Sequence, residues 1–162
     1  MNNTPNSNRP HIVFYGKTNA GKSTLMNKVL GQDFALVSDK PGTTTDYIQK
    51  AMELIPFGPV LFIDTAGLFD STELGELRVS RTLEMLKRTD LGIYVTDGSE
   101  EEIKKYISWK KNFKKYNIPH LLVINKIDML QENKIDELKK NYKEAFFTSG
   151  ETGKGKIGRA HV

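Results

Sequence analysis

The sequence predicts an α/β fold: one domain with a six-stranded, mostly parallel sheet and helices on both of its faces. Short apolar runs alternate with amphipathic stretches between residues 12 and 148, which is typical of a parallel sheet covered by helices. The chain has 162 residues, the size of one ordinary domain with its own core. Its polar and glycine-rich segments follow directly after several of the apolar runs.

The expected elements follow one another without repeats or low-complexity segments. In the first half we expect a strand at 12–15, a helix at 22–30, extended segments at 47–55 and 60–63, and a helix at 72–87. In the second half we expect a strand at 91–96, a helix at 100–116, a strand at 120–124, a short helix at 131–140 and a strand at 145–148.

Periodicity predicts the buried face of the helices. In the helix at 72–87, Val79, Leu83 and Leu86 have the spacing of one apolar face. In the helix at 100–116, two stripes compete for burial. One comprises Ile103, Ile107 and Lys110, and the other comprises Tyr106, Trp109, Phe113 and Tyr116. We interpret the aromatic residues as core packing or partly exposed bulk and not as a base-stacking surface, so that the six lysines between 104 and 115 form a solvated face.

The composition favours a soluble, cytoplasmic protein that binds neither membranes nor nucleic acid. Lys and Arg number 24 against 20 Asp and Glu, a formal net charge of +4, but the lysines are interleaved with glutamates. No apolar run approaches the roughly 18 residues that span a bilayer, and the N-terminus lacks the layout of a signal peptide. The absence of Cys excludes disulfides and thiolate metal or cluster sites within these residues.

The C-terminal end has an unusual sequence. Residues 157–162 read Ile-Gly-Arg-Ala-His-Val, which a common sequencing adaptor encodes, so we expect a non-native tail there. The strand–helix pattern requires one more covering helix after residue 148. We therefore expect residues 1–156 to be a single domain truncated before its last helix, with one apolar face of the sheet left exposed.

A phosphate-binding pattern lies between the first strand and the first helix. Residues 16–23 read Gly-Lys-Thr-Asn-Ala-Gly-Lys-Ser, which satisfies G-x-x-x-x-G-K-S/T in the required context. Its backbone N–H groups and the start of the helix would face phosphate oxygens; Lys22 would supply charge to the β and γ phosphates, and the Ser23 hydroxyl would ligate Mg²⁺. The predicted nucleotide-binding residues here are Asn19, Ala20, Gly21, Lys22, Ser23 and Thr24. The alternative is a glycine-rich turn with an ordinary surface lysine.

Asp64-Thr65-Ala66-Gly67 follows the strand at 60–63. This short pattern means little alone, but after a second parallel strand it acquires a function. Asp64 can meet the magnesium shell through water, and the Gly67 N–H can reach the γ-phosphate.

Asn125-Lys126-Ile127-Asp128, after the strand at 120–124, selects the base. The Asp128 carboxylate can accept from both guanine N1–H and N2–H₂, whereas adenine offers no such donor pair and would leave the carboxylate unpaired. Asn125 would brace the loop and reach N7, and Lys126 would lie over the ring. Ser149 and Gly150, after the last strand, are placed so that a backbone N–H can meet guanine O6. The alternative for Asn125 to Asp128 is a solvated turn.

Together these motifs resemble a translation-factor-class GTPase domain. Residues 36–46 are similar to the first switch of the potassium-stimulated bacterial group that includes the TrmE, Era and EngA GTPases. The resemblance implies that Thr44, with Thr43 in reserve, completes the magnesium shell, so that Lys22, Thr44 and Gly67 are the expected catalytic residues. It also implies that Asn19 helps to hold K⁺, although simple turn chemistry is the alternative.

Leu68 stands where some GTPases have a water-positioning Gln, which it cannot replace by hydrogen bonding, so Glu73 or Glu76 is the expected substitute.

Within this group the chain resembles the iron-iron (FeFe) hydrogenase maturation GTPases, the HydF family. The residues that carry this resemblance are 8–12, 31–33, 35–39, 43–46, 51–54, 58–60 and 73–79. It implies a scaffold whose GTP turnover gates association with maturation enzymes and the apo-hydrogenase, and whose further domains dimerise and hold a 4Fe-4S cluster. The alternatives are a ribosome-assembly or tRNA-modification GTPase, or a nucleotide-switched interaction module with negligible hydrolysis. A P-loop kinase is a poorer alternative, because Asn125 to Asp128 would have no function in it.

Overall fold

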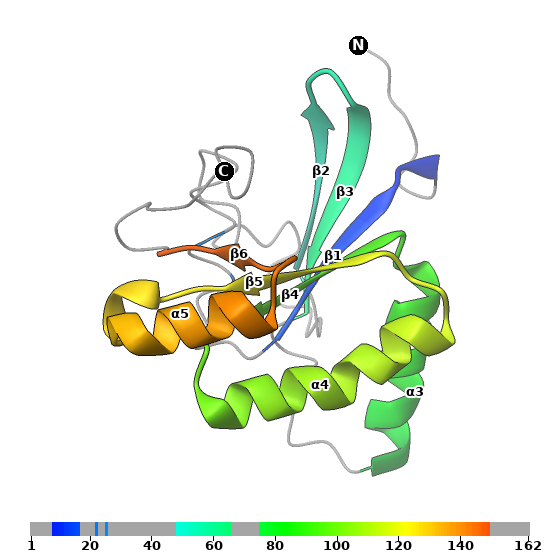
Figure 1. Ribbon diagram of the computed structural model, residues 1–162. Coiled ribbons are helices and arrows are strands. Elements are labelled where there is room, and N and C mark those ends of the chain that lie inside the picture. Colours follow the sequence, from blue (N-terminus) through cyan, green and yellow to red (C-terminus); the bar gives the residue numbers. More distant parts are fainter. Residues whose placement is uncertain (1–7, 17–21, 23–24, 26–47, 66–74, 150–162) are drawn as a thin grey trace.

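The computed structural model describes residues 8–16, 22, 25, 48–65 and 75–149. Its strands form one six-stranded sheet in the order β2-β3-β1-β4-β5-β6 (Figure 1). Only the pairing of β2 with β3 is antiparallel. The strands are β1 (His11–Tyr15), β2 (Ile48–Leu54), β3 (Gly58–Asp64), β4 (Leu91–Thr96), β5 (His120–Ile124) and β6 (Phe146–Phe147). The predicted mostly parallel sheet is confirmed.

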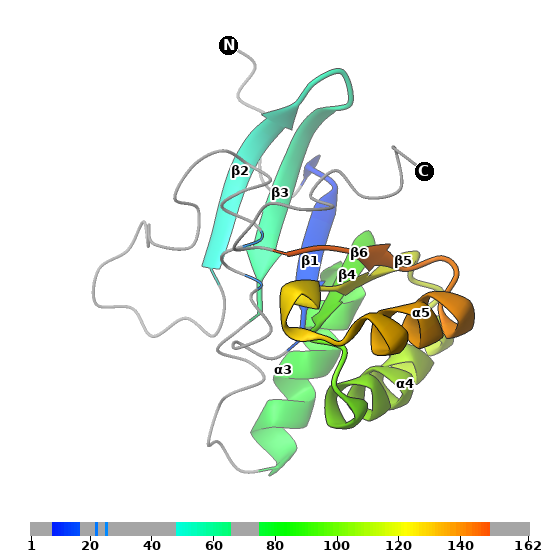
Figure 2. The ribbon, with the colours of Figure 1, turned by 60° about the vertical axis from the view of Figure 1, so that its left-hand side comes forward.

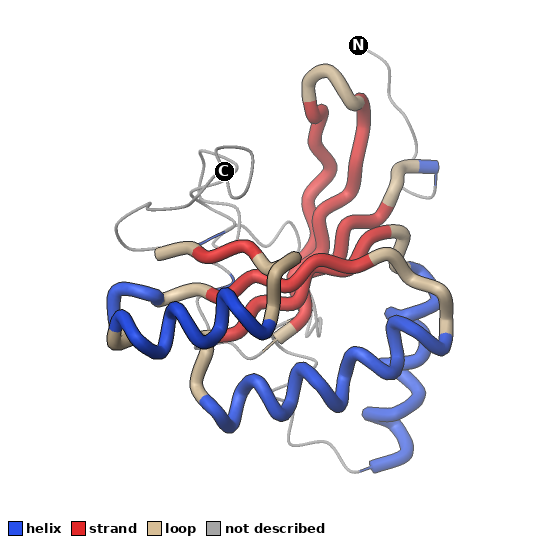
Figure 3. The backbone as a smooth tube through the Cα atoms, viewed as in Figure 1, coloured by secondary structure: helices blue, strands red, loops and turns tan. Residues whose placement is uncertain are grey.

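Three helices cover one face of this sheet: α3 (Gly75–Arg88), α4 (Glu100–Lys115) and α5 (Glu132–Asn141) (Figure 3). A single 3-10 turn, η4 (Ile127–Met129), precedes α5. Alternate residues of the strands, such as Val13, Ile63 and Ile124, are buried against these helices. The predicted order of strands and helices is confirmed over the described residues.

The opposite face of the sheet is also apolar. Ile12, Phe14, Phe62 and Val95 form a second buried cluster there, and Leu25 packs against it in helical conformation. Of the helix expected at 22–30, only residues 22 and 25 belong to the described part of the chain. The expected last helix and the tail at 157–162 concern residues outside that part.

In helix α4 the aromatic stripe, and not the stripe of Ile103, Ile107 and Lys110, faces the core. Tyr106 and Phe113 are buried, and the Phe113 ring packs edge-on against Tyr15 with centroids 5.2 Å apart. Ile103 is buried as well, whereas Ile107 is 48% exposed. The aromatic residues are therefore core, and the lysines of the helix are exposed as expected.

Helix α3 departs from its expected face at one position. Leu86 is buried and Leu83 packs against the core, but Val79 is 58% exposed. Met85 takes a buried place in the core instead. Among the residues of α3 whose side chains are described, those buried in the core lie in its C-terminal half, and the prediction for Val79 was wrong.

Strands β2 and β3 form a hairpin that extends beyond the rest of the sheet (Figure 2). Its turn is apolar: Ile55 is 95% and Phe57 is 71% exposed. From this turn β3 runs back into the sheet beside β1, with Phe14 paired to Asp64 at the far end. In the described part of the chain, no helix is long and apolar enough to cross a membrane.

Candidate functional site

The polar motifs meet at one edge of the sheet because parallel strands bring their carboxyl ends together. Gly16 follows β1, Asp64 ends β3, Asn125 follows β5 and Ser149 comes soon after β6. Positions separated by more than a hundred residues in the chain therefore share this edge of the fold.

Two residues of the predicted phosphate-binding pattern, Gly16 and Lys22, belong to the described part of the chain. Lys22 is fully buried, and its ammonium group donates a hydrogen bond to the carbonyl of Gly16. Gly16 has φ +119°, and a Cβ placed on it would lie 2.2 Å from the carbonyl oxygen of Val95. Only glycine fits this turn, which leads the chain from β1 into the loop.

The end of β3 is tied to the end of β1. The Thr65 backbone N–H and side-chain Oγ1 both donate to the carbonyl of Phe14, at 3.2 and 2.7 Å. Asp64, next to it, is 1% exposed. These bonds fix the end of β3, where Asp64 lies, against the end of β1, with Asp64 in register with Phe14.

A second pair of loops meets at β5 and β6. The Asn125 N–H donates to the Thr96 carbonyl at 2.7 Å, and the Thr148 hydroxyl donates to Asn125 Oδ1 at 2.9 Å. The Ile127 N–H donates to the Thr148 carbonyl at 3.2 Å, so that the turn after β5 is anchored by the segment after β6. Through these bonds Asn125 connects the ends of β4 and β5 with the segment after β6.

Asp128 is oriented by Ser149. The Ser149 hydroxyl donates to Asp128 Oδ1 at 2.7 Å. Asp128 is exposed and a carboxylate has about four acceptor sites, so this bond leaves acceptor capacity directed to solvent. Lys126, between the two polar residues, has a left-handed backbone with φ 59°.

Neither the role of Thr148 nor the bond from Ser149 to Asp128 was predicted from the sequence. The available signal was the pair of adjacent hydroxyl residues, Thr148 and Ser149, directly after the last strand. Their geometry needs the register of β5 and β6, in which Ile124 pairs with Phe147.

Several predicted site residues lie outside the described part of the chain. They are Asn19, Ala20, Gly21, Ser23, Thr24, Thr43, Thr44, Gly67, Leu68, Glu73 and Gly150. The backbone of Glu76 belongs to α3, but its side chain is outside the description as well. Their roles stay predictions.

The donor set suits a magnesium ion shared with phosphates better than a metal cage made by the protein. Among the described residues there is no group of three or more His, Cys, Asp or Glu side chains that could hold a metal ion. Mg²⁺ usually takes one or two carboxylates together with waters and substrate phosphates. Asp64, a buried carboxylate at the end of β3, fits that pattern.

Comparison with known proteins identifies the same kind of domain. Residues 11–126 match the family model of the 50S ribosome-binding GTPases. The tRNA modification GTPase MnmE of Thermotoga maritima is 39% identical over 135 residues, which cover 79% of this chain and 28% of that relative. GTPase Era of Clostridium acetobutylicum is 33% identical over 136 residues, which cover 83% of this chain and 46% of Era. The chain therefore spans less than half the length of these curated relatives.

Solved structures share the fold. A probable GTP-binding protein engB superposes with a TM-score of 0.64 at 21% identity, over 91% of this chain and 92% of that chain. Era in complex with MgGDPNP and nucleotides 1506–1542 of 16S ribosomal RNA has a TM-score of 0.62 at 28% identity, over 89% of this chain and 52% of that chain. By motif, fold and sequence, this chain belongs to the 50S ribosome-binding GTPase family, as a GTP-binding domain of the TrmE, Era and Der type.

Proposed function

We propose that the chain binds GTP with Mg²⁺ at the carboxyl edge of its sheet and hydrolyses it to GDP and phosphate. Bound Mg²⁺ would neutralise charge that develops on the phosphate oxygens. Ser23, Thr44 and Asp64 would hold the ion, while Lys22 and the Gly67 N–H would face the β and γ phosphates. Backbone N–H groups of residues 19–24 would complete the phosphate cradle, and Asn19 would help to hold K⁺.

The guanine base would be recognised by Asn125, Lys126, Asp128, Ser149 and Gly150. One observation carries this assignment: Ser149 and Thr148, from a loop beyond β6, hold Asp128 and Asn125 in place by hydrogen bonds of 2.7 and 2.9 Å. A carboxylate held in this way is prepared to accept two parallel N–H donors, which guanine presents and adenine does not. Preorganisation lowers the cost of ordering the loop when the base binds.

Substitution of Asp128 by Asn tests this assignment. The variant should lose preference for GTP over ATP, because its amide presents a donor where guanine also presents donors. Calorimetric titration with GTP and ATP in the presence of Mg²⁺ measures both affinities. Unaltered selectivity would overturn the base site, and absence of any heat with GTP on folded wild-type protein would overturn nucleotide binding itself.

Potassium dependence tests the role of Asn19. Phosphate release should be faster in K⁺ than in Na⁺, because only the larger ion would fit the place beside Asn19 in the potassium-stimulated group that the chain resembles. An Asn19→Ala variant should then show equal rates in both salts. Equal rates in the unmodified chain would remove Asn19 from this role.

For the wider role we propose that residues 1–156 are the GTPase domain of an iron-iron hydrogenase maturation scaffold. Its GTP turnover would gate association with maturation enzymes and the apo-hydrogenase, in the cytoplasm. The support is the family resemblance of residues 35–39, 43–46 and 73–79 to HydF proteins. A 4Fe-4S cluster would belong to other domains, because these residues include no Cys. The resemblance also implies that a homodimer interface belongs to those domains. Residues 157–162 are proposed to be a non-native tail.

A second candidate is a ribosome-assembly or tRNA-modification GTPase. It is favoured by the 39% identity to a tRNA modification GTPase and by the structural likeness to Era bound to ribosomal RNA. Sequencing of the gene beyond codon 162 separates the two. Cys or His cluster ligands downstream would support the maturation scaffold, and a basic RNA-binding domain would support the second candidate. The same reading tests whether residues 157–162 have natural codons.

A further inference from the structure

Helix α4 carries an exposed isoleucine surrounded by lysines. Ile107 is 48% exposed in the middle of the helix. Relative to it, lysines occupy positions i−3, i+3, i+4 and i+7, namely Lys104, Lys110, Lys111 and Lys114, and all four are exposed. Residues with these spacings are neighbours on a helix surface, with Cβ atoms about 5–6 Å apart at i±3 and i±4. We call these five residues the lysine face.

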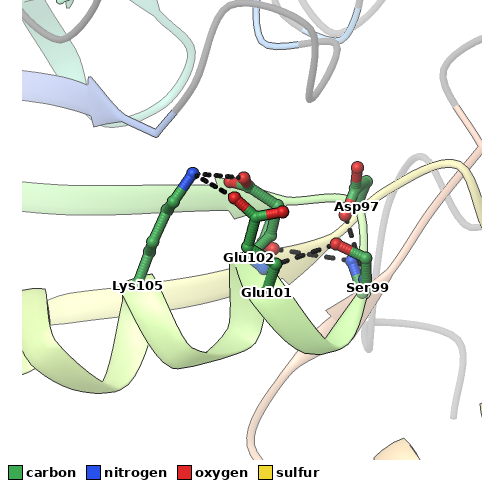
Figure 4. A network of polar contacts seen from close by, with 7 residues as sticks. Asp97, Ser99, Glu101, Glu102 and Lys105 are labelled. Atoms are coloured by element: carbon green, nitrogen blue, oxygen red, sulfur yellow. Dashed lines mark hydrogen bonds and ion pairs between the residues drawn. The ribbon is translucent and has the colours of Figure 1, made fainter.

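The positive charge at the start of α4 is neutralised within the helix. Lys104 lies 3.4 Å from Glu100, and Lys105 lies 3.1 Å from Glu101 and 2.9 Å from Glu102 (Figure 4). The helix therefore uses its three glutamates at its N-terminal end, where the macrodipole also favours them.

The rest of the lysine face has no such compensation. No carboxylate of the described residues lies within ion-pair distance of Lys110, Lys111 or Lys114. The macrodipole explains a lysine in the last turn, such as Lys114, but acts weakly on positions one turn earlier. It gives no reason for an exposed Ile107 among them.

We propose that the lysine face is a docking surface for an acidic protein segment that seats an apolar side chain on Ile107. Protein interfaces typically combine a small apolar centre with a polar rim. Here the centre is one branched aliphatic residue and the rim carries three uncompensated positive charges. Complementary negative charge on the partner would steer the encounter and fix its register. The lysine face includes none of the residues proposed to bind the nucleotide, so the proposal does not depend on the proposed function.

The chemistry of the face favours a protein over the other polyanions. Single-stranded RNA is recognised by stacking on exposed aromatic rings or Arg planes, but the face has no Arg, and Tyr106 and Phe113 of this helix point into the core. A membrane-binding helix needs a broad apolar face, and Ile107 alone does not supply one.

Fluorescence anisotropy with a labelled peptide tests the proposal on the whole 162-residue chain. The probe is a run of glutamates with two central leucines, and the comparison peptide has serines in place of the leucines. Ile107→Ser should weaken binding of the leucine peptide about tenfold, the effect of an anchor worth about 1.4 kcal/mol. It should leave binding of the serine peptide unchanged.

Charge reversal completes the test. Lys110→Glu with Lys114→Glu should weaken binding of the leucine peptide at least about tenfold at low salt. The matched control, Lys140→Glu with Lys143→Glu, makes the same change of net charge on exposed lysines of and after α5 and should alter affinity less than about twofold. Thermal unfolding should be similar for all variants, because surface substitutions usually change stability by about 0.5 kcal/mol or less.

Three outcomes would overturn the proposal. The first is equal affinity for the two peptides, or no effect of Ile107→Ser, either of which would leave only non-specific charge attraction. The second is equal loss in both charge-reversal variants. The third is tighter binding of a single-stranded RNA oligonucleotide or of phosphatidylserine vesicles than of the leucine peptide, with the same sensitivity to Lys110 and Lys114. A negative result in any of these peptide-binding experiments would not change the result of the GTP assays. The docking proposal and the GTP-binding proposal are therefore tested separately.

Discussion

The hydroxyl of Ser149 donates a hydrogen bond of 2.7 Å to Oδ1 of Asp128, across 21 residues of chain. The carboxylate belongs to the turn after β5 and the hydroxyl to the segment after β6, so the pairing of these two strands determines how the Asp128 carboxylate is oriented. If Asp128 recognises the base, as we propose, base selectivity depends on both segments together.

Removal of that hydroxyl should weaken guanine nucleotide binding. Ser149→Ala leaves the Asp128 carboxylate free to rotate, and a hydrogen bond to a charged group contributes about 1.5–3 kcal/mol. The bond is partly exposed, so we expect the low end, a loss of about tenfold in GTP affinity with reduced preference over ATP. Calorimetric titration measures both. Ser108→Ala, on the exposed side of α4, is the control; wild-type affinity in Ser149→Ala would show that Asp128 is held by other means.

Gly16 and Gly58 provide a matched test of the turn after β1. Both have similar positive φ, +119° and +115°, but a Cβ on Gly16 would meet the Val95 carbonyl at 2.2 Å, whereas a Cβ on Gly58 would meet nothing within 4 Å. Gly58→Ala should cost only the backbone strain, about 1–2 kcal/mol. Gly16→Ala should cost more than about 3 kcal/mol, because β4 is paired on both sides and cannot retreat.

Urea denaturation without nucleotide measures both free energies of unfolding. Equal losses in the two variants would mean that the Val95 contact relaxes without cost, contrary to the packing described above.

Close packing between β4 and α4 predicts a coupled pair. A Cβ on Gly92 would lie 2.7 Å from Cε1 of Phe113. That ring is fully buried and stacked on His120 with centroids 4.8 Å apart. Gly92→Ala should destabilise the fold by about 2–3 kcal/mol through overpacking. Phe113→Leu should recover part of that loss in the double variant although it is destabilising alone, which a double-mutant cycle detects; additive effects would contradict the contact.

Stability should fall at high pH because of Tyr94. Burial and the nearby Glu102 raise the pKa of Tyr94 from 10.0 to about 12. The unfolded chain loses this proton first, so the stabilisation is complete below pH 10 and is lost as the pH rises towards 12, at about 1.4 kcal/mol per pH unit. Burial also raises the pKa of Tyr15, so deprotonation of this residue also lowers the free energy of unfolding at high pH.

Tyr94→Phe should therefore flatten the decline in the free energy of unfolding between about pH 10 and 12. Denaturation at a series of pH values provides the measurement. An identical slope in the variant would assign the whole decline to other groups.

The fold could be predicted from the sequence because most strands are short apolar runs that end at a polar or glycine-rich segment, although β2 reads Ile-Gln-Lys-Ala-Met-Glu-Leu and is not such a run. The phosphate and base motifs could be placed for the same reason, since Gly16 and Asn125 follow strands directly and Asp64 ends one. What could not be predicted depends on contacts between elements. No feature of the neighbouring sequence distinguishes Ile107 from Ile103. Their exposure depends on the rotation of α4 about its axis, which is the rotation that buries Phe113 against Gly92.

The role of Thr148 was missed for a related reason. Its hydroxyl reaches Asn125 only through the pairing of β5 with β6, and a two-residue strand gives no register signal in the sequence. Val79 was placed in the core on periodicity alone, which does not record that the N-terminal half of α3 carries it away from the sheet. Spacing predicts which residues share a face but not how far along a helix the core extends.

The left-handed backbone of Lys126 has a thermodynamic consequence. A residue other than glycine at φ 59° costs about 1–2 kcal/mol of the free energy of folding. A guanine nucleotide that packs on this loop would stabilise only the folded chain, by about 2.7 kcal/mol at a concentration one hundred times its dissociation constant. The melting temperature should therefore rise with ligand concentration, which would make thermal shift a direct titration of occupancy.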